Sequence, residues 1–306
     1  MSIIALEIDV DTYRGTLEGV PRLVAALERA GARATFLFSL GPDHTGRALK
    51  RVFRRGFLGK VRRTSVVSHY GIRTLLYGVL LPGPHIGRRC AGVMRDVAQR
   101  GFEVGIHTYD HIKWQDGVAR AGRAWTSRQL ILAREEFVRV FAREPETHGA
   151  AGWQVNRDVP ALEAAMMLHY ASDTRGSGPF VPVVDGKEVM VPQLPTTLPT
   201  LDELIGREDL GGLDPVDHLL SLTEGPEDHV FTLHAELEGG AYLAGFERLL
   251  HEWRARGRAL TDLATYAASL DRDRLPRCPI EAGSVPGRAG TLAVQGEKQT
   301  QEVTRP

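Results

Sequence analysis

The stretch Ile3-Ile4-Ala5-Leu6-Glu7-Ile8-Asp9-Val10-Asp11 opens the chain with an apolar run that leads directly into two carboxylates. An apolar run of this length predicts a buried strand. A helical pattern over residues 20–27 follows, ends near Gly31, and leads into a second apolar run at residues 35–40. The order strand, helix, strand predicts the start of a parallel α/β sheet.

The same alternation continues along the chain. We expect further helices at 90–100, 127–142 and 246–256, and further strands at 102–106, 149–153, 170–173 and 230–235. Repeated β-α units predict a parallel sheet that is either open or closed into a barrel. In both forms, ligands bind at the carboxyl ends of the strands.

Length and composition agree with a single large α/β domain. The chain has 306 residues, of which 42% are hydrophobic and 25% charged, and its formal net charge is zero, which gives no hint of a nucleic-acid partner. Cys90 and Cys278 are far apart in the sequence and form no CxxC motif, so neither a disulfide framework nor a thiolate zinc site is expected. The start of the chain does not resemble a signal peptide, and no apolar stretch is long enough to span a bilayer. We therefore expect a cytoplasmic protein that meets a membrane only at its surface.

Two carboxylates follow the first strand. Asp9 and Asp11 are two residues apart, so the strand period points both side chains to the same side of the sheet. Such a pair is costly unless a cation or a shared proton relieves it, which favours a metal ligand beside a general base. The alternative is an acidic junction between the strand and a turn at Arg14-Gly15.

Histidines follow two other predicted strands. His107 and His111 share one face if a helical turn begins there, and with Asp11 they would form a two-histidine, one-carboxylate set for a divalent ion such as zinc, manganese, cobalt or iron. His234 ends the predicted strand 230–235 and would arrive at the same edge of a parallel sheet. Each residue alone could be an ordinary polar group, but their coincidence at three strand ends favours one shared site.

The segment from about residue 44 to 95 predicts a basic amphipathic insertion. No acidic residue occurs between Asp43 and Asp96, and apolar residues at 49–57 lie opposite a basic helical face. The basic residues are Arg47, Lys50, Arg51, Arg54, Arg55, Lys60, Arg62 and Arg63. With an apolar patch at 75–81, the pattern indicates a helix at an anionic membrane surface. The alternatives are a solvated basic face and a nucleic-acid patch, and the sparse aromatic residues disfavour the latter.

Five motifs in order resemble those of the polysaccharide deacetylase (NodB-like) family. They are Asp9-Val10-Asp11, His107-x-x-x-His111, Ala151-Gly152-Trp153, Ser172-Asp173 and Leu233-His234. The resemblance extends to about residue 265 and implies a distorted (β/α)7 barrel. We therefore expect one catalytic domain at 1–278, followed by a disordered tail at 279–306, where periodicity is lost.

Longer stretches resemble the members of this family that act on a lipid-linked formamido sugar. These stretches lie at residues 8–15, 172–176, 194–200 and 234–239. The resemblance implies metal-dependent deformylation of undecaprenyl-phosphate-linked 4-deoxy-4-formamido-L-arabinose, a step of lipid A modification and polymyxin resistance. It also implies a location at the cytoplasmic face of the inner membrane. The preference for formyl over acetyl follows from this resemblance alone.

The resemblance also assigns roles to individual residues. It makes Asp9 the general base, His234 the general acid and Asp173 the carboxylate that orients His234. Asp11, His107 and His111 become the ligands of one divalent metal ion. Many family members carry an arginine in the third motif where this chain has Gln154, and Arg14 or Arg175 could replace it. The residues expected to contact substrate are Arg14, Trp153, Arg175 and Glu236.

Three other functions are compatible with these motifs. The first is an N-deacetylase of a soluble or polymeric amino sugar, which needs no basic insertion. The second is a non-catalytic protein that binds a lipid carrier. The third is an iron oxygenase, which leaves Asp9 and His234 without roles. No oligomeric state is predicted.

Overall fold

A parallel sheet forms the centre of the computed structural model, which describes residues 2–47 and 74–298. Within these residues the sheet has seven strands in the order β5-β4-β3-β2-β1-β8, with β9 also pairing with β1. Every pair in it is parallel. The strands are β1 (Ile3–Val10), β2 (Thr35–Ser39), β3 (Glu103–Thr108), β4 (Thr147–His148), β5 (Tyr170–Ala171), β8 (His229–His234) and β9 (Ala259–Thr261).

Strand β1 is the central element. Its residues from Ile4 onward are buried, as its apolar sequence predicts. On one side it pairs with β8, and the register places Asp9 opposite His234. On the other side, its carboxyl half pairs with β2 and its first residues pair with β9. The two catalytic candidates therefore lie on adjacent strands at the same level of the sheet.

An irregular segment at residues 192–198 joins the two edges of the sheet. The backbone N–H of Leu194 donates to the carbonyl of Ala171 after β5, and that of Thr197 donates to the carbonyl of Val230 in β8. These bonds close the parallel strands into a distorted barrel, which confirms the predicted fold class. Because these hydrogen bonds join it to both edge strands, the motif stretch at 194–200 contributes to the wall of the barrel.

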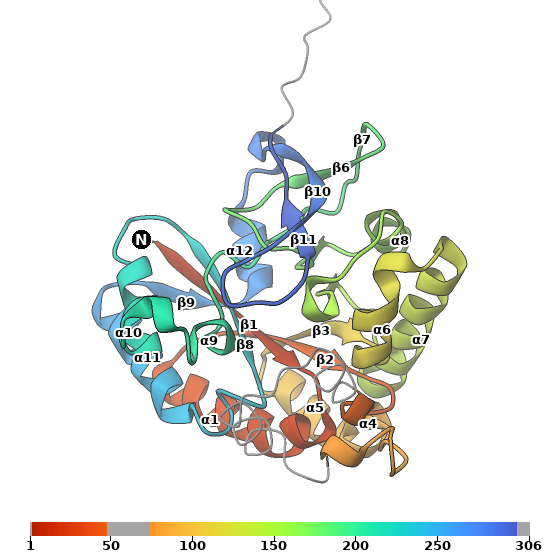
Figure 1. Ribbon diagram of the computed structural model, residues 1–306, viewed down its shortest axis with the longest axis horizontal. Helices are drawn as coiled ribbons and strands as arrows, with labels where there is room; N and C mark the ends of the chain where they lie inside the picture. Colours follow the sequence, from red (N-terminus) through yellow and green to blue (C-terminus); the bar gives the residue numbers. More distant parts are fainter. Residues whose placement is uncertain (1, 48–73, 299–306) are drawn as a thin grey trace, which may run out of the picture.

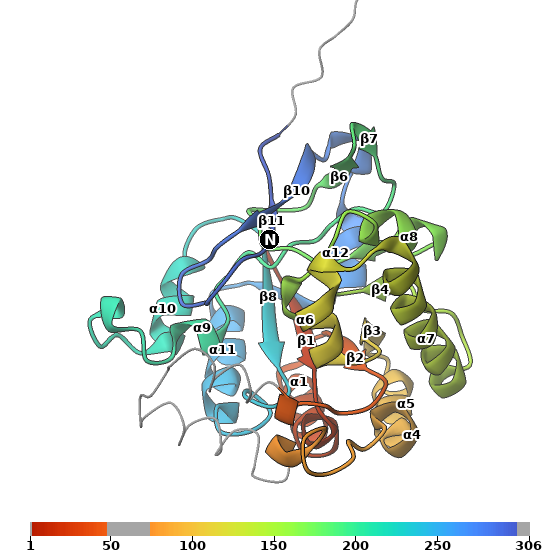
Figure 2. The ribbon, with the colours of Figure 1, turned by 45° about the vertical axis from the view of Figure 1, so that its right-hand side comes forward.

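Helices surround the barrel, as Figures 1 and 2 show. The longer ones are α1 (Val20–Ala30), α5 (Ala91–Gln99), α7 (Arg123–Phe141), α10 (Pro215–Leu222) and α11 (Leu243–Ala255). The shorter ones are α4 (Ile86–Arg89), α6 (His111–Gly117), α8 (Val159–Ala165), α9 (Leu201–Leu204) and α12 (Leu263–Ser269). Helix α1 begins with Pro21 in its first turn and ends at Gly31, whose φ of 58° only glycine adopts without strain. No helix among the described residues is long and apolar enough to cross a membrane.

The predicted disordered tail is wrong for most of its length. Strands β10 (Arg277–Gly283) and β11 (Leu292–Gln295) form a second sheet with β6 (Val181–Val184) and β7 (Lys187–Glu188) in the order β11-β10-β6-β7. Strand β10 pairs in parallel with β6, about a hundred residues away in the chain, and Leu292 is buried. The missing periodicity therefore reflects short strands stabilised by distant partners. Only residues 299–306 of the predicted tail lie outside the described part.

Two other boundaries differ from the prediction. In place of the strand expected at 149–153, the structure has β4 at Thr147–His148. Gly152 and Trp153 take left-handed φ values of 63° and 52°, which are not compatible with a strand. The predicted insertion ends earlier than residue 95, since Ile86 and Met94 are buried in the main core. Residues 48–73, which carry Lys50, Arg51, Arg54, Arg55, Lys60, Arg62 and Arg63, lie outside the described residues.

Candidate metal centre and hydrolytic site

Asp11, His107 and His111 meet at the carboxyl edge of the barrel. Oδ1 of Asp11 lies 3.2 Å from Nε2 of His107 and 3.4 Å from Nε2 of His111. The three donor atoms lie close enough together to hold a single metal ion. A carboxylate oxygen and two imidazole nitrogens suit several divalent transition metals.

The two histidines reach this point from different elements. His107 lies in β3, whereas His111 is the first residue of α6, which Asp110 caps by accepting a hydrogen bond from the backbone N–H of Lys113. The bend between strand and helix, rather than one helical face, brings the imidazoles together. Nδ1 of His107 lies 2.8 Å from the carbonyl oxygen of Gly149, a contact that turns Nε2 toward Asp11.

The electrostatics of the triad fit a cation. Oδ1 of Asp11 is buried and has no hydrogen-bond partner among the described residues. Burial alone raises the pKa of Asp11, but the charges of His111 and His107 lower it well below its usual value. A buried carboxylate that stays ionised beside two imidazoles is a set of ligands for a divalent ion.

Asp9 lies beside the triad, and its Oδ1 has no hydrogen-bond partner among the described residues. It is 5% exposed, and its Oδ1 lies 3.6 Å from Nδ1 of His107. Burial raises the pKa of Asp9 well above its usual value, against the charge of His107 and together with that of Glu7. Among the ion pairs of the described residues, none joins Asp9 to an arginine. Neither Arg14 nor Arg175 therefore replaces the third-motif arginine at this carboxylate.

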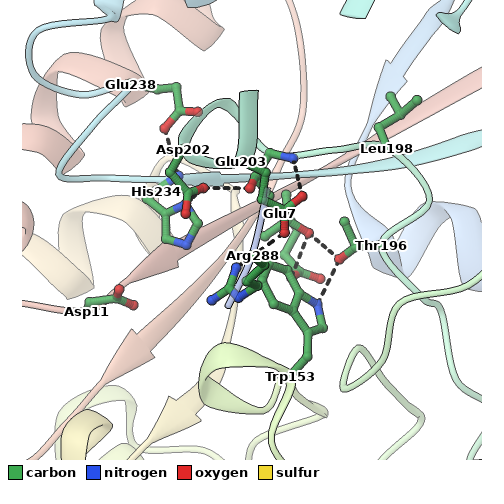
Figure 3. Close-up of polar contacts among 12 residues, drawn as sticks. Glu7, Asp11, Trp153, Thr196, Leu198, Asp202, Glu203, His234, Glu238 and Arg288 are labelled. Carbon is green, nitrogen blue, oxygen red and sulfur yellow. Dashed lines mark hydrogen bonds and ion pairs between the residues drawn. The ribbon is translucent and has the colours of Figure 1, made fainter. Parts of the chain in front are cut away.

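His234 is the last residue of β8, on the other side of β1, and its acidic neighbour is Asp202 in α9 (Figure 3). Nδ1 of His234 lies 3.8 Å from Oδ1 of Asp202, and its backbone N–H donates to Glu238 at 2.9 Å. His234 is near enough to the triad for its charge to lower the pKa of Asp11. The three predicted strand ends therefore converge on one site.

The predicted role of Asp173 as the partner of His234 is wrong. Asp173 is fully buried and lies 3.1 Å from Nδ1 of His148, and it also accepts hydrogen bonds from the backbone of Ala150 and the side chain of Gln193. Glu163 completes this buried cluster, with Oε1 2.7 Å from the same nitrogen of His148. Both carboxylate oxygens of Asp173 are therefore occupied by partners within the protein, away from His234.

The cluster of His148, Glu163 and Asp173 could hold a metal by distance alone. Its contacts instead match a buried ion pair. Burial lowers the pKa of His148, but Asp173 and Glu163 together raise it to about 10. Burial raises the pKa of Glu163 well above its usual value, whereas the charge of His148 lowers that of Asp173. An imidazolium shared by one ionised and one protonated carboxyl group accounts for these directions.

Trp153 and Arg175 form a buried support for the acid side of the site, which is the side that contains the expected general acid His234. The Trp153 ring is 2% exposed, and its Nε1 donates to Thr196. Arg175 is also buried, and its three side-chain nitrogens donate to Thr196, Glu203 and Leu198. Arg175 therefore has its donors occupied by the protein, in contrast to the substrate contact expected from the sequence.

Arg14 and Glu236 lie at a pocket of about 300 Å³ next to Thr12. Arg14 is half-exposed and pairs with Glu18 at 2.9 Å. Glu236 accepts hydrogen bonds from the backbone and hydroxyl of Thr12, and burial, together with the charge of Asp11, raises its pKa to about 8. Both residues remain candidates for contact with substrate at this rim.

Asp202 and Arg288 are site residues that no sequence motif indicates. Asp202 lies in the capping box formed by Thr200 and Glu203, a pattern that predicts the start of a helix but not a place in the site. Arg288 lies in the segment predicted to be disordered, so no local signal pointed to it. Gln154 proves to bind that same segment, because its Nε2 donates to the carbonyl of Thr291 at 2.7 Å.

The fold recurs in a solved structure described as a "putative polysaccharide deacetylase from Mycobacterium smegmatis", with a TM-score of 0.61, 15% identity, and coverage of 93% of this chain and 96% of that one. The architecture is therefore that of the polysaccharide deacetylases.

A curated protein of Shewanella sediminis (strain HAW-EB3) is 34% identical over 247 residues, which cover 81% of this chain and 80% of that protein. One of Wigglesworthia glossinidia brevipalpis is 29% identical over 283 residues, which cover 92% and 98%. Both are named "Probable 4-deoxy-4-formamido-L-arabinose-phosphoundecaprenol deformylase ArnD". The chain belongs to this deformylase family.

The resemblance to the polysaccharide deacetylases and the more specific resemblance to the deformylases of a formamido sugar are thus both confirmed. No protein-family model matches the chain.

Proposed function

We propose that this protein hydrolyses the formamide of undecaprenyl-phosphate-linked 4-deoxy-4-formamido-L-arabinose and releases formate and the amino sugar lipid. The observation that carries the proposal is the convergence of Asp11, His107 and His111 with Asp9 and His234 at one edge of the barrel. The names of the curated relatives supply the substrate. The site supplies the chemistry expected of an amide hydrolase.

Asp11, His107 and His111 would hold one divalent ion, either zinc, manganese, cobalt or iron. When bound, this ion supplies Lewis acidity for the formamide carbonyl and for the attacking water. His107 and Asp11 are buried and His107 is oriented by Gly149, so the ligands are already arranged for coordination.

Asp9 acts as the general base in this proposal. Its buried carboxylate lies beside His107, and no arginine within residues 2–47 and 74–298 holds it as an ion pair. A raised pKa makes the carboxylate a stronger base for the proton of the attacking water. The oxygen of that water then bonds to the formyl carbon.

His234 donates the proton that the departing nitrogen needs. The carbon–nitrogen bond breaks, the sugar keeps its amine, and the formyl carbon leaves as formate. Asp202 holds the imidazole from its Nδ1 side, which leaves Nε2 to face the substrate. Asp202 is thus a positioning residue, in the role that the sequence had assigned to Asp173.

The deciding experiment offers the purified protein two synthetic lipids that differ only in formamido or acetamido arabinose. We expect chelator-sensitive release of formate and little release of acetate, with activity restored by a divalent metal. Preferential release of acetate would indicate a deacetylase, and tight binding without turnover would indicate a carrier-binding protein. A requirement for oxygen would indicate an oxygenase. Metal analysis of the active protein would identify the ion.

We also propose that the chain meets its lipid-linked substrate at an anionic membrane surface. Val79, Leu80 and Leu81 are 42%, 76% and 39% exposed in a turn before α4. Nε of Arg47 donates to the carbonyl of Gly78 in the same turn, at 3.1 Å. An exposed apolar turn that contacts a basic side chain is typical of proteins that lie on a bilayer.

Liposome flotation tests this second proposal. Leu80→Ser and a variant with serine in place of every lysine and arginine from 47 to 63 should both float less with anionic vesicles. Met190→Ser is the control, because Met190 is also 76% exposed but lies near β7. Flotation equal to that of the unmodified protein in both test variants would rule out this surface.

A further inference from the structure

The turn between β10 and β11, at residues 284–291, brings a cation to the acid side of the site. This turn returns toward the centre of the molecule, as Figures 1 and 2 show. Gly287 has a φ of 83°, and a Cβ there would lie 2.1 Å from the carbonyl oxygen of Glu203. Glycine is therefore required at the contact, and the close approach fixes where the next residue, Arg288, enters the site.

Arg288 is held in place by two neighbours. The centre of its guanidinium lies 4.5 Å from the centre of the Trp153 ring, and its Nη1 lies 3.4 Å from Oε1 of Glu203. Stacking on an indole and pairing with a carboxylate order a long side chain before any ligand arrives. Figure 3 shows the guanidinium between Trp153 and the pair formed by His234 and Asp202.

The donors of Arg288 differ from those of Arg175. All three side-chain nitrogens of Arg175 donate to protein oxygens, and the side chain is 9% exposed. Arg288 is 21% exposed, and in the described part of the chain its guanidinium donates a hydrogen bond to Glu203 alone. Its Nε and Nη2 are therefore available to an acceptor that enters from the site.

The charges around Arg288 indicate what that acceptor is. Glu203 is paired at 2.5 Å with Arg175, and Asp202 faces His234, which must be protonated to act as the acid. Each of these two carboxylates thus has another cation beside it, so neither needs the charge of Arg288 for its neutralisation. A substrate that brings one negative charge would balance it.

We propose that Arg288 binds the phosphodiester of the lipid-linked sugar and so selects polyprenyl-phosphate glycosides over neutral ones. This inference rests on the proposed function, whose substrate carries one phosphodiester charge. A guanidinium fork donates two hydrogen bonds to phosphate oxygens, and such bonds are among the strongest in proteins. The C-terminal turn is then a part of the substrate site.

The test compares two formamido arabinose substrates, the undecaprenyl phosphodiester and an uncharged alkyl glycoside. Arg288→Ala should reduce the ratio of kcat/KM for the charged substrate to that for the neutral one by about 10- to 100-fold, the range for losing a hydrogen bond to a charged group. Arg288→Lys keeps the charge and should lose less. Arg157→Ala is the control, because Arg157 is 73% exposed and pairs with Asp185 at the surface. An unchanged ratio in Arg288→Ala would overturn the inference.

Binding without turnover separates this inference from the proposed function. The probe is undecaprenyl-phosphate-linked L-arabinose without the formamido group, and thermal melting confirms that each variant is folded. Weaker binding of this probe by Arg288→Ala supports the phosphate contact, even if the unmodified protein releases no formate and the proposed reaction fails. Equal binding by both proteins rejects the contact, whatever the activity.

Discussion

Oδ1 of Asp202 lies 3.8 Å from Nδ1 of His234, and it reaches this position from the short helix α9. The hydroxyl of Thr200 donates to the same carboxylate at 2.5 Å and so restricts its orientation. The side chain of Asp202 is 46% exposed; partial loss of solvent raises its pKa, but the charges of His234 and Arg288 lower it overall. The carboxylate is therefore ionised where the imidazole needs an anionic partner.

Replacing Asp202 should impair the chemical step rather than the fold. We expect Asp202→Asn to lower kcat by about 10- to 100-fold, as loss of an orienting partner does in comparable sites. KM should change little, because the imidazole is needed mainly in the transition state. Steady-state kinetics on the formamido lipid measure both values.

Asp173 provides the matched control for Asp202. Because Asp173 pairs with buried His148, Asp173→Asn should lower the melting temperature, whereas Asp202→Asn should not. If instead Asp173→Asn reproduces the kinetic defect at full stability, the original assignment from the sequence is right and the role of Asp202 is wrong.

Variants of the base Asp9, in β1, and of the metal ligand Asp11, directly after β1, should differ in the amount of metal that they bind. Asp9→Asn should lower kcat by about 100- to 10,000-fold and keep a bound metal ion, since Asp9 transfers a proton. Asp11→Ala should lose metal and activity together, because its oxygen contacts both imidazoles. Metal analysis of the purified variants checks this difference, and equal metal content with full activity in both would remove the assignment.

The buried cluster at His148 should make stability depend on pH. The folded pKa of about 10 lies above the unfolded value near 6.5, so the stabilisation is fully present below pH 6.5 and is lost as the pH rises through 10. Between pH 7 and 10 the free energy of unfolding should fall, by at most about 1.4 kcal/mol per pH unit for this one proton. Urea unfolding at several pH values measures the slope.

The variant His148→Gln separates the contribution of His148 to the pH dependence of stability from that of other groups that titrate in the same pH range. Glu236 and Glu238, both with a pKa raised to about 8 by burial, also weaken the fold as the pH rises through 8. His148→Gln should therefore remove only part of the slope, mostly above pH 8. His169→Gln is the control, since that histidine is 64% exposed. Identical slopes in His148→Gln and the unmodified protein would exclude a charged His148.

The metal triad could be predicted because its members follow local patterns. Asp11 and His107 lie at the ends of apolar runs, and parallel strands bring such ends to one edge whatever the loops between them do. Asp202 carries no such signal. It reaches His234 only because α9 packs near β8, a contact set by the closure of the barrel.

The C-terminal segment failed prediction for a related reason. Strand β10 combines charged, apolar and small residues with a proline, and it becomes a strand only through its pairing with β6 and β11. Gly287 lies in the segment predicted to be disordered, yet in the structure its left-handed φ allows the turn to pack on Glu203. Pairing between distant segments cannot be deduced from the period of either one.

Arg175 should stabilise the fold, in contrast to the substrate contact expected from the sequence. Its pair with Glu203 is buried, so Arg175→Met should lower the free energy of unfolding by about 3–5 kcal/mol. The matched control is Arg157→Met, whose exposed pair with Asp185 should contribute less than about 1 kcal/mol. Urea unfolding compares the two. Full stability of Arg175→Met with a large rise in KM would mean that Arg175 leaves Glu203 to bind substrate, and the division of roles between Arg175 and Arg288 would then be reversed.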